Sequence, residues 1–593
     1  MNKHALLLIL FSFMMKISST SAFVQSRASN GNGLRWASNT PSINLVVETS
    51  KSVDLSASQV MSALNQSILQ YSFRTPISFT SIEGADAPDV SSVSFTTEPY
   101  FGAGILAITS VAYNSNSGEI KEADVLVNEN YTFSSSATAS AGTYYLGDVL
   151  THELGHLLGL SHSEVHDSTM MFTAFRGQWS LAEDDSNGLN DLYAVQGLGT
   201  ISGKVVTGTS PTAFFAAKVE VISSKLGKVV GSSLSLAEGT FSVGGLPLDD
   251  TYYLYVSPLK STSSLPAYFS SAITKVCSGS SFRGSFFTKC GENELDRPQG
   301  IHLSSIVPNI DVGKVSIRCN FSTSFDYLDY KSSTARPERS LFDYQHETGG
   351  VLSGVFFNYE KLGPLVTTYA DSFTVDLSTV GSPSGKNLDL QFISQSLFSP
   401  LAVSIYVTRT ESAPPTQAQY SYVYSSTSPT YTLDMVENLN RHLTIPLSAN
   451  SNENVFTIKL APVANFTPSQ LDALFPSASL FLDNLSPYLL IAGLSQSGNI
   501  ISSVDHTPYV DNTSCSEKTN NPVAVPFTTN KDLVDSSLKK GAASQNQAMA
   551  CGTVDFDGGD DDDGQSGPMS LMIGFFSVLL LIKLKKSWSL QKD

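Results

Sequence analysis

Three histidines stand close together in the segment HELGHLLGLSH, which covers residues 152–162. On a helix, residues four positions apart share a face, so His152 and His156 can direct their imidazoles at one metal ion. Gly159 permits a backbone conformation that ends such a helix and turns the chain, after which His162 supplies a third nitrogen. Three neutral histidines leave a fourth tetrahedral position open, which is the arrangement of a catalytic zinc site.

Glu153 is the predicted catalytic base of this site, because it follows the first ligand directly on the same helix. Zinc lowers the pKa of a water held at the open position to about 7. A carboxylate beside that water takes its proton during attack on a carbonyl and then passes the proton to the departing amine. The spacing therefore predicts one catalytic zinc and the hydrolysis of peptide bonds.

The elements that must position these residues are predicted to form an α/β domain over residues 23–197. Val60, Leu64 and Ile68 are four apart and predict an amphipathic helix, with Ser58 as its cap. Further helices are expected at residues 146–158 and 183–193. Runs rich in β-branched residues predict strands at residues 43–49, 77–82, 93–97, 105–113 and 123–127.

The motif and its surroundings resemble the matrixin branch of the metzincin zinc peptidases. Ser163 follows the third histidine, where astacin-like enzymes carry Glu and serralysin-like enzymes carry Pro. Met170 stands at the position of the family's Met-turn, and residues 181–193 are similar to the matrixin C-terminal helix with its acidic pair. The resemblance covers roughly residues 34–195 and implies an α+β metzincin catalytic domain that cleaves proteins or peptides.

The resemblance also implies roles for residues outside the metal motif. Residues 104–107 are similar to the edge strand that binds substrate in extended form by adding it to the sheet. Leu106 and Ala107 are therefore candidate substrate-binding residues. The thioether of Met170 is expected to form the floor beneath the zinc ligands.

Two positions depart from the family pattern. Ile108 and Leu126 stand where animal matrixins carry the histidines of a structural zinc, so no such zinc is predicted. Residues 172–174 read Phe-Thr-Ala instead of the Pro-x-Tyr of the usual pocket wall, so the family's substrate preferences cannot be carried over.

The sequence also bears on calcium binding and on how the peptidase could be kept latent. The polar side chains of Asp124, Asn128 and Glu129 are candidate calcium ligands, with ordinary solvated side chains as the alternative interpretation. No cysteine precedes the metal motif, and only a short segment separates Phe23 from Trp36. We therefore expect no propeptide and no capping of the zinc by a thiol, so that any latency must come from elsewhere.

The bulk properties indicate a multidomain exported protein. A chain of 593 residues is long enough for several domains with their own cores. The formal net charge of −18 argues against nucleic acid as a partner and is most simply explained by solubility. Residues 1–22 have the basic start, short apolar core and small residues of a secretory signal peptide, which predicts an extracellular location.

The regions after the catalytic domain are predicted to be all-β. Residues 199–315 resemble, over about 200–257, the carboxypeptidase regulatory-like β-sandwich. Residues 316–527 alternate β-branched and aromatic runs with turns and predict one or two β-sandwiches of unknown role. Cys277 and Cys290 are the nearest candidates for a disulfide among five cysteines, although the sequence leaves the pairing open.

The C-terminal part is predicted to attach the protein to a surface. Residues 528–567 are polar and acidic and read as a linker. Residues 568–583 are apolar and are followed by a basic tail to residue 593. This layout is similar to the sorting signals of bacterial surface proteins, and a plain transmembrane anchor is the alternative.

Two functions are compatible with this organisation. The first is a secreted or surface-attached zinc endopeptidase. The second is a surface adhesin or stalk with a vestigial peptidase domain, because most of the chain is β-rich and carries no visible catalytic pattern. The first is favoured because no ligand, base, turn glycine or Met-turn residue is missing from the motif.

Overall fold

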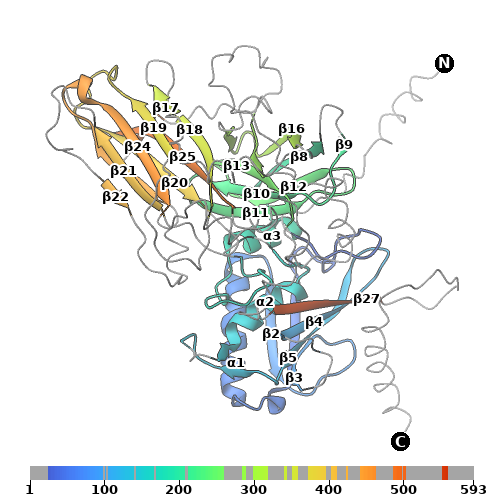
Figure 1. Ribbon diagram of the computed structural model, residues 1–593. Coiled ribbons are helices and arrows are strands. Elements are labelled where there is room, and N and C mark those ends of the chain that lie inside the picture. The colour runs from blue at the N-terminus through green and yellow to red at the C-terminus, as the bar shows by residue number, and fades with distance from the viewer. Residues whose placement is uncertain are drawn as a thin grey trace, which may run out of the picture.

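The protein is represented by a computed structural model (Figure 1). The residues that it describes are 24–97, 101, 104–138, 142–163, 165, 168–207, 212–259, 284–288, 298–317, 339–343, 350–357, 371–394, 403–409, 422–424, 441–462, 485–496, 499–502 and 550–557. The predicted signal peptide, the apolar segment 568–583 and the cysteine pair Cys277 and Cys290 lie outside these residues.

The N-terminal domain is built on one sheet in the order β2-β1-β3-β5-β4-β27, in which β27 is Ala550–Asp557, with helices α1 and α2 packed against the sheet. β1, β2, β3 and β5 pair in parallel, and β4 pairs antiparallel with β5. The predicted strands and helices are confirmed to within a few residues. The elements are β1 Ser42–Val47, a 3-10 turn at Thr49–Lys51, α1 Ala57–Arg74, β2 Ser78–Glu83, β3 Ser92–Thr96, β4 Ile105–Tyr113, β5 Ile120–Asn128, β6 Thr132–Ser134, β7 Thr143–Tyr145, α2 Leu146–Leu157 and α3 Glu183–Leu192.

Helix α1 buries the predicted stripe against the rest of the domain: Val60, Leu64 and Ile68 are all buried. The predicted cap was wrong, because the helix begins at Ala57 and its N-cap is Ser56. The main-chain N–H of Ser56 donates to Gln59 Oε1 at 2.9 Å, which satisfies a donor that the helix itself cannot pair. Ser56 and Ser58 stand on either side of Ala57 and have the same capping chemistry.

The region that follows consists of two sheets, in the orders β11-β10-β13-β14, with β15 also paired to β13, and β12-β8-β16, with β9 also paired to β8. Its last strand runs to Ile317, slightly beyond the predicted boundary at residue 315. The strands are β8 Gly199–Thr207, β9 Thr212–Ala213, β10 Lys218–Ser223, β11 Lys228–Leu234, β12 Thr240–Leu246, β13 Asp250–Ser257, β14 Ser285–Phe286, β15 Ile301–Leu303 and β16 Asn309–Ile317.

A third region, within residues 339–502, adds two more sheets, β17-β19-β24-β21-β22 and β18-β25-β20-β23, with β26 paired to β25. Buried side chains from both sheets, such as Phe373 and Leu490, share one apolar cluster. The strands are β17 Arg339–Asp343, β18 Gly350–Phe357, β19 Asp371–Asp376, β20 Lys386–Ser394, β21 Val403–Arg409, β22 Tyr422–Tyr424, β23 Arg441–Pro446, β24 Val455–Pro462, β25 Leu485–Gln496 and β26 Asn499–Ser502.

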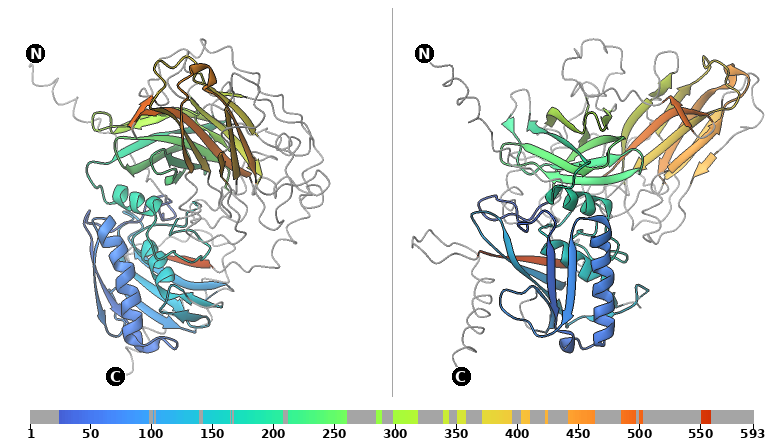
Figure 2. Two further views of the ribbon diagram at one scale, coloured as in Figure 1. Left: turned by 90° about the vertical axis from the view of Figure 1, so that its left-hand side faces the viewer. Right: turned by 180° about the vertical axis from the view of Figure 1, so that it is seen from behind.

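The N-terminal domain and the second region meet at α3, which lies between them in Figure 1 and in the right-hand view of Figure 2. α3 contacts β11 and β12, and Leu189 of the helix belongs to the same buried cluster as Val230 and Leu246. The Asn187 side chain donates to the Val230 carbonyl at 2.8 Å. The two regions therefore share a continuous core.

The linker prediction for residues 528–567 was wrong in one part. Ala550–Asp557 forms strand β27, which pairs with the outer edge of β4. The segment contains Thr, Val and Phe, which favour strands, and an open sheet edge offers unpaired main-chain groups. Within the described ranges, no helix combines the length and apolar character needed to cross a membrane.

Candidate metal centre

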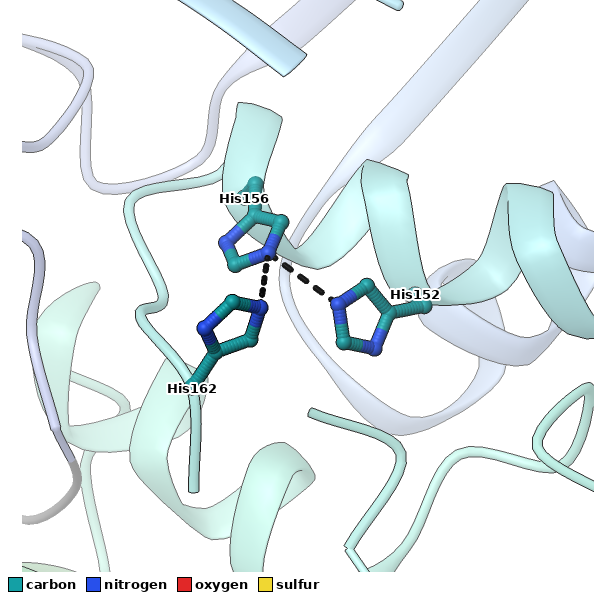
Figure 3. A group of neighbouring side chains, drawn as sticks. All are labelled: His152, His156 and His162. Carbon is teal, nitrogen blue, oxygen red and sulfur yellow. Dashed lines mark hydrogen bonds between the residues drawn. The ribbon is translucent and has the colours of Figure 1, made fainter. Parts of the chain in front are cut away.

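The three predicted ligands meet in space. His152 and His156 come from α2, and His162 comes from the loop that follows it (Figure 3). The Nε2 atom of His156 lies 3.1 Å from that of His152 and 3.2 Å from that of His162. Tetrahedral zinc with Zn–N bonds of about 2.0–2.1 Å places its nitrogens roughly 3.3 Å apart. The donor set and its spacing therefore fit a zinc ion.

The main chain fixes which nitrogen of two rings is available to a metal. His152 Nδ1 lies 2.8 Å from the Thr169 carbonyl, and His156 Nδ1 lies 2.9 Å from the Leu160 carbonyl. Because a carbonyl only accepts, each Nδ1 must carry the proton and donate it. The Nε2 lone pairs then point to the shared centre, as metal-binding histidines require.

The electrostatic surroundings keep these rings neutral. Burial lowers the pKa of His152 to about 4. Burial, with the nearby His162 and His152 rings, holds the pKa of His156 well below its ordinary value. Since only the neutral imidazole binds a metal, His152 and His156 are ready for an ion at neutral pH without losing a proton first.

Gly159 ends the helix as predicted. Its φ of +98° lies in the left-handed region that favours glycine. The N–H of Leu160 donates back to the Gly155 carbonyl at 3.0 Å, which closes the last turn. A Cβ at Gly159 would lie 2.4 Å from the Leu34 carbonyl oxygen. Backbone conformation and space therefore both require glycine where the chain turns to bring in His162.

Met170 lies against the metal-binding helix, as its predicted role requires. Its side chain is buried, and a Cβ at Gly155 would lie 2.2 Å from its sulfur. Gly155 lies between His152 and His156 on this helix, so the thioether packs against the turn that carries the two ligands. The main-chain N–H of Ser163 donates to the Met170 carbonyl at 2.8 Å, which ties this turn to the loop of the third ligand.

Asp184 and Asp185, the acidic pair of α3, bind the two loops that flank the metal centre. Asp185 accepts hydrogen bonds from Ser168 Oγ at 2.7 Å and from the N–H of Thr169 at 2.6 Å. Asp184 accepts one from Ser163 Oγ at 2.8 Å. Burial raises the pKa of the Asp185 carboxyl. The helix thus anchors both the turn that contains Met170 and the loop of the third ligand.

Glu153 is fully buried on α2 and has a partner that the sequence did not reveal. Thr109 of β4 donates its hydroxyl to Glu153 Oε2 at 2.5 Å. Ala107, Thr109 and Val111 alternate along β4 and are all fully buried, so they share the inward face of the strand. Thr109 is a polar residue at an inward position of a strand, and this is the feature of the sequence from which the contact with Glu153 could have been predicted.

The N-terminal segment is a second contribution that sequence reasoning missed. The N–H of Ser161 donates to the Val24 carbonyl at 2.7 Å, and the N–H of Ser26 donates to the Gly159 carbonyl at 2.9 Å. Trp36 Nε1 donates to the Leu157 carbonyl at 3.0 Å. These residues lie far from the motif in sequence and support the end of α2 and the loop that leads to the third ligand.

The candidate substrate-binding residues Leu106 and Ala107 lie on β4 and are fully buried. Ala107 pairs with Val127 of β5 in the sheet. Ile108 and Leu126, the positions without the family's structural-zinc histidines, are direct register partners on the same two strands. The assignment of Leu106 and Ala107 to substrate binding stays a prediction.

The candidate calcium ligands each bond to a different part of the protein. Asp124 Oδ1 accepts from the N–H and the hydroxyl of Ser92 at 3.0 and 2.8 Å. Asn128 Nδ2 donates to the Ile105 carbonyl at 2.7 Å. Glu129 Oε2 accepts from the N–H of Val53 at 3.2 Å. A calcium site at these residues stays a prediction.

One cysteine belongs to a described strand of the sheet that carries the metal centre, and the expectation that no thiol caps the zinc stays a prediction. Cys551 follows the motif in sequence but belongs to β27, which pairs with β4 and contacts α2. The tertiary structure therefore places a cysteine-bearing strand at the edge of the sheet that carries the site.

Comparison with known proteins agrees with the geometry. Residues 35–194 match the family profile described as Matrixin. A 150-residue stretch is 32% identical to metalloendoproteinase 2-MMP of Arabidopsis thaliana. This match covers 23% of the chain and 37% of the plant protein, so the chain spans well under half of that relative's length. Residues 35–194 are therefore similar to a matrixin catalytic domain, and they contain the complete histidine triad.

Proposed function

We propose that the chain is a zinc-dependent endopeptidase that cleaves proteins at the centre formed by His152, His156 and His162. One observation carries the proposal. Three buried imidazoles converge through their Nε2 atoms, and the buried carboxylate of Glu153, which follows the first ligand on the same helix, accepts a hydrogen bond from Thr109. The family match over residues 35–194 and the similarity to a plant metalloendoproteinase support the same activity.

The residues of the chain divide the work of hydrolysis. A zinc ion held by the triad would supply Lewis-acid polarisation of water and of the scissile carbonyl. Glu153 accepts a proton from the attacking water and delivers it to the leaving amine. Thr109 keeps that carboxylate oriented for both transfers. Substrate binds in extended form along β4, near Leu106 and Ala107, by main-chain hydrogen bonds of the kind that pair strands.

The rest of the chain is proposed to place this activity outside the cell. The signal-like residues 1–22 and the apolar segment 568–583 with its basic tail support export and attachment to a membrane or cell surface. The paired sheets within residues 199–502 support a reading as β-sandwich modules that hold the catalytic domain away from the surface or bind targets. The intact metal centre speaks against the adhesin with a vestigial peptidase domain.

The test is a Glu153→Gln variant of the full chain, assayed beside the wild type on denatured proteins with and without a chelator. Gln keeps the size of the side chain but cannot accept the proton, so we expect kcat to fall about 10²- to 10⁴-fold at unchanged zinc content. Chelation should abolish wild-type cleavage, and added zinc should restore it. Wild-type protein that holds one zinc yet shows no chelator-sensitive cleavage on a broad substrate panel would refute the function.

A further inference from the structure

The outer edge of β4 is already occupied by a strand of the same chain. β27 pairs in parallel with β4 along almost its whole length, from Ala550 opposite Ile105 to Asp557 opposite Tyr113. It is the last strand in the sheet order, beyond β4 on the side away from β5. The left-hand view of Figure 2 shows this dark red strand alongside the blue sheet.

This strand lies at the catalytic site and not merely at a remote part of the sheet. β27 contacts α2, the helix that carries Glu153 and two of the three metal ligands. The register partner of Thr553 on β4 is Thr109, whose hydroxyl binds Glu153. The main chain of β27 therefore runs past the residue that orients the predicted base.

An extended substrate needs the same groups that β27 uses. A sheet edge offers one row of main-chain N–H and C=O groups, and a peptide that adds to the sheet must pair with that row. The inner edge of β4 is filled by β5. Substrate and β27 consequently compete for a single outer edge. Because β27 belongs to the same chain, its pairing with that edge is intramolecular, which favours it over a dilute substrate.

We propose that residues 550–557 are an internal competitor that covers the substrate-binding edge of β4 and keeps the peptidase in a state of low activity. The proposal rests on the proposed peptidase function. Cleavage requires that β27 leave the edge, through displacement by a substrate or partner strand or through loss of the segment. The effect acts on substrate binding, so it raises KM and leaves kcat unchanged once substrate is in place.

The test uses two double variants of the full-length protein. Thr553→Pro with Val554→Pro removes two successive main-chain N–H groups, one of which faces β4 because neighbouring residues of a strand point their N–H groups to opposite sides. Thr553→Ala with Val554→Ala is the matched control, because it shortens the same side chains and keeps both N–H groups. Both variants retain Cys551, so the comparison isolates main-chain pairing.

Two measurements are made on each protein: peptide cleavage, and hydrogen–deuterium exchange over residues 105–113. We expect the proline variant to lower KM at least about tenfold at unchanged kcat and to speed exchange in β4. The alanine variant should keep slow exchange and a KM within a few-fold of the wild type. If KM and the exchange rate are the same in the wild type and the proline variant, residues 550–557 do not compete with substrate and the proposal is refuted. Cleavage by the wild type would still show that the protein is a peptidase.

The failure of the proposed function gives a different result. If exchange in β4 accelerates in the proline variant but no protein cleaves any peptide, the peptidase function is refuted and the inhibitory role is refuted with it. Exchange does not depend on activity, so the two failures are separable.

Discussion

At the scale of single residues, the centre depends on contacts that orient groups already chosen by their chemistry. The carbonyls of Thr169 and Leu160 fix the protonated nitrogen of two ligands, and Thr109 fixes the carboxylate of Glu153. A buried carboxylate gains more from such a donor than an exposed one, because no water competes for it. Thr109 is therefore a positioning residue for the proposed base.

Replacing Thr109 by Val keeps the shape of the side chain and removes the donor to Glu153. A hydrogen bond to a charged group is worth about 1.5–3 kcal/mol, so we expect kcat to fall about 10- to 100-fold with KM and zinc content unchanged. Thr109→Ser retains the hydroxyl and should restore most of kcat. Steady-state kinetics with metal analysis would check this, and equal losses in the Val and Ser variants would assign Thr109 to packing.

At the scale of elements, the end of α2 and its beginning are both held by neighbours. At the C-terminal end, Gly159 has a left-handed backbone, and the carbonyl of Leu34 leaves no room for a Cβ there. Near the N-terminal end, Asp148 Oδ1 accepts from the N–H groups of Gly177 and Trp179 at 3.2 and 2.9 Å. These contacts set the position of the helix relative to the loops around the metal centre.

Gly159→Ala should weaken zinc binding and lower the thermal stability of the catalytic domain. Alanine at φ +98° is strained, and its Cβ would also lie 2.4 Å from the Leu34 oxygen. Gly197→Ala is the control, because Gly197 has a φ of +81° and no atom within 4 Å of the added Cβ. Zinc titration and melting curves should show a larger loss of zinc affinity and of thermal stability for Gly159→Ala than for Gly197→Ala. Similar losses in the two variants would show that the close approach of the Leu34 oxygen contributes nothing.

The pH dependence of stability should reveal Asp148. Burial raises its pKa to about 6 from an ordinary 3.8. The folded protein binds this proton more tightly than the unfolded chain does. Asp148 therefore contributes most to the stability of the fold below pH 3.8, and this contribution is lost as pH rises through about 6. Asn keeps an oxygen for both N–H donors and stays neutral, so Asp148→Asn should gain up to about 3 kcal/mol over the wild type between pH 4 and pH 8.

Urea unfolding of the metal-free protein would measure this difference, followed by the fluorescence of Trp36 and Trp179, both of which belong to the catalytic domain. Chelation removes the separate effect of pH on metal binding. A difference in unfolding free energy between Asp148→Asn and the wild type that is constant across this pH range would show that the Asp148 carboxyl titrates normally.

At the scale of the whole molecule, the catalytic domain is not mechanically independent of the β-rich region that follows it. Asp184 on α3 accepts from Ser163 in the loop of the third ligand and, at 3.3 Å, from Ser232 of β11. Gly245 of β12 approaches α3 so closely that a Cβ there would lie 1.9 Å from the Asn187 carbonyl oxygen. The second region therefore supports the helix that anchors the loops of the metal centre.

Gly245→Ala should lower the melting temperature by several degrees and reduce kcat/KM, because the added Cβ forces β12 away from α3. Gly313→Ala is the matched control in the same region: its φ is +71°, close to the +66° of Gly245, but nothing lies within 4 Å of its Cβ. Calorimetry and peptide cleavage would compare the two variants. If they behave alike, contact between the regions contributes nothing beyond backbone strain.

The local sequence predicted much of the catalytic domain, because its signals are local. The i, i+4 histidines, the glycine after the helix and the β-branched run of β4 are each recognised within a few neighbouring residues. The cap of α1 was wrong by two residues, since Ser56 and Ser58 offer the same chemistry and only the neighbouring Gln59 decides between them.

The sequence by itself thus determined the ligands, the candidate base and the order of the elements, since these follow from residue type and spacing. Only the tertiary structure decided what supports and covers them. The contact of Thr109 with Glu153, the N-terminal segment beneath the third ligand and the pairing of β27 with β4 join residues far apart in sequence. A sheet edge can pair with any extended segment, because the main-chain groups that form the hydrogen bonds are common to all residues. The side chains of residues 550–557 therefore could not predict that this segment pairs with β4.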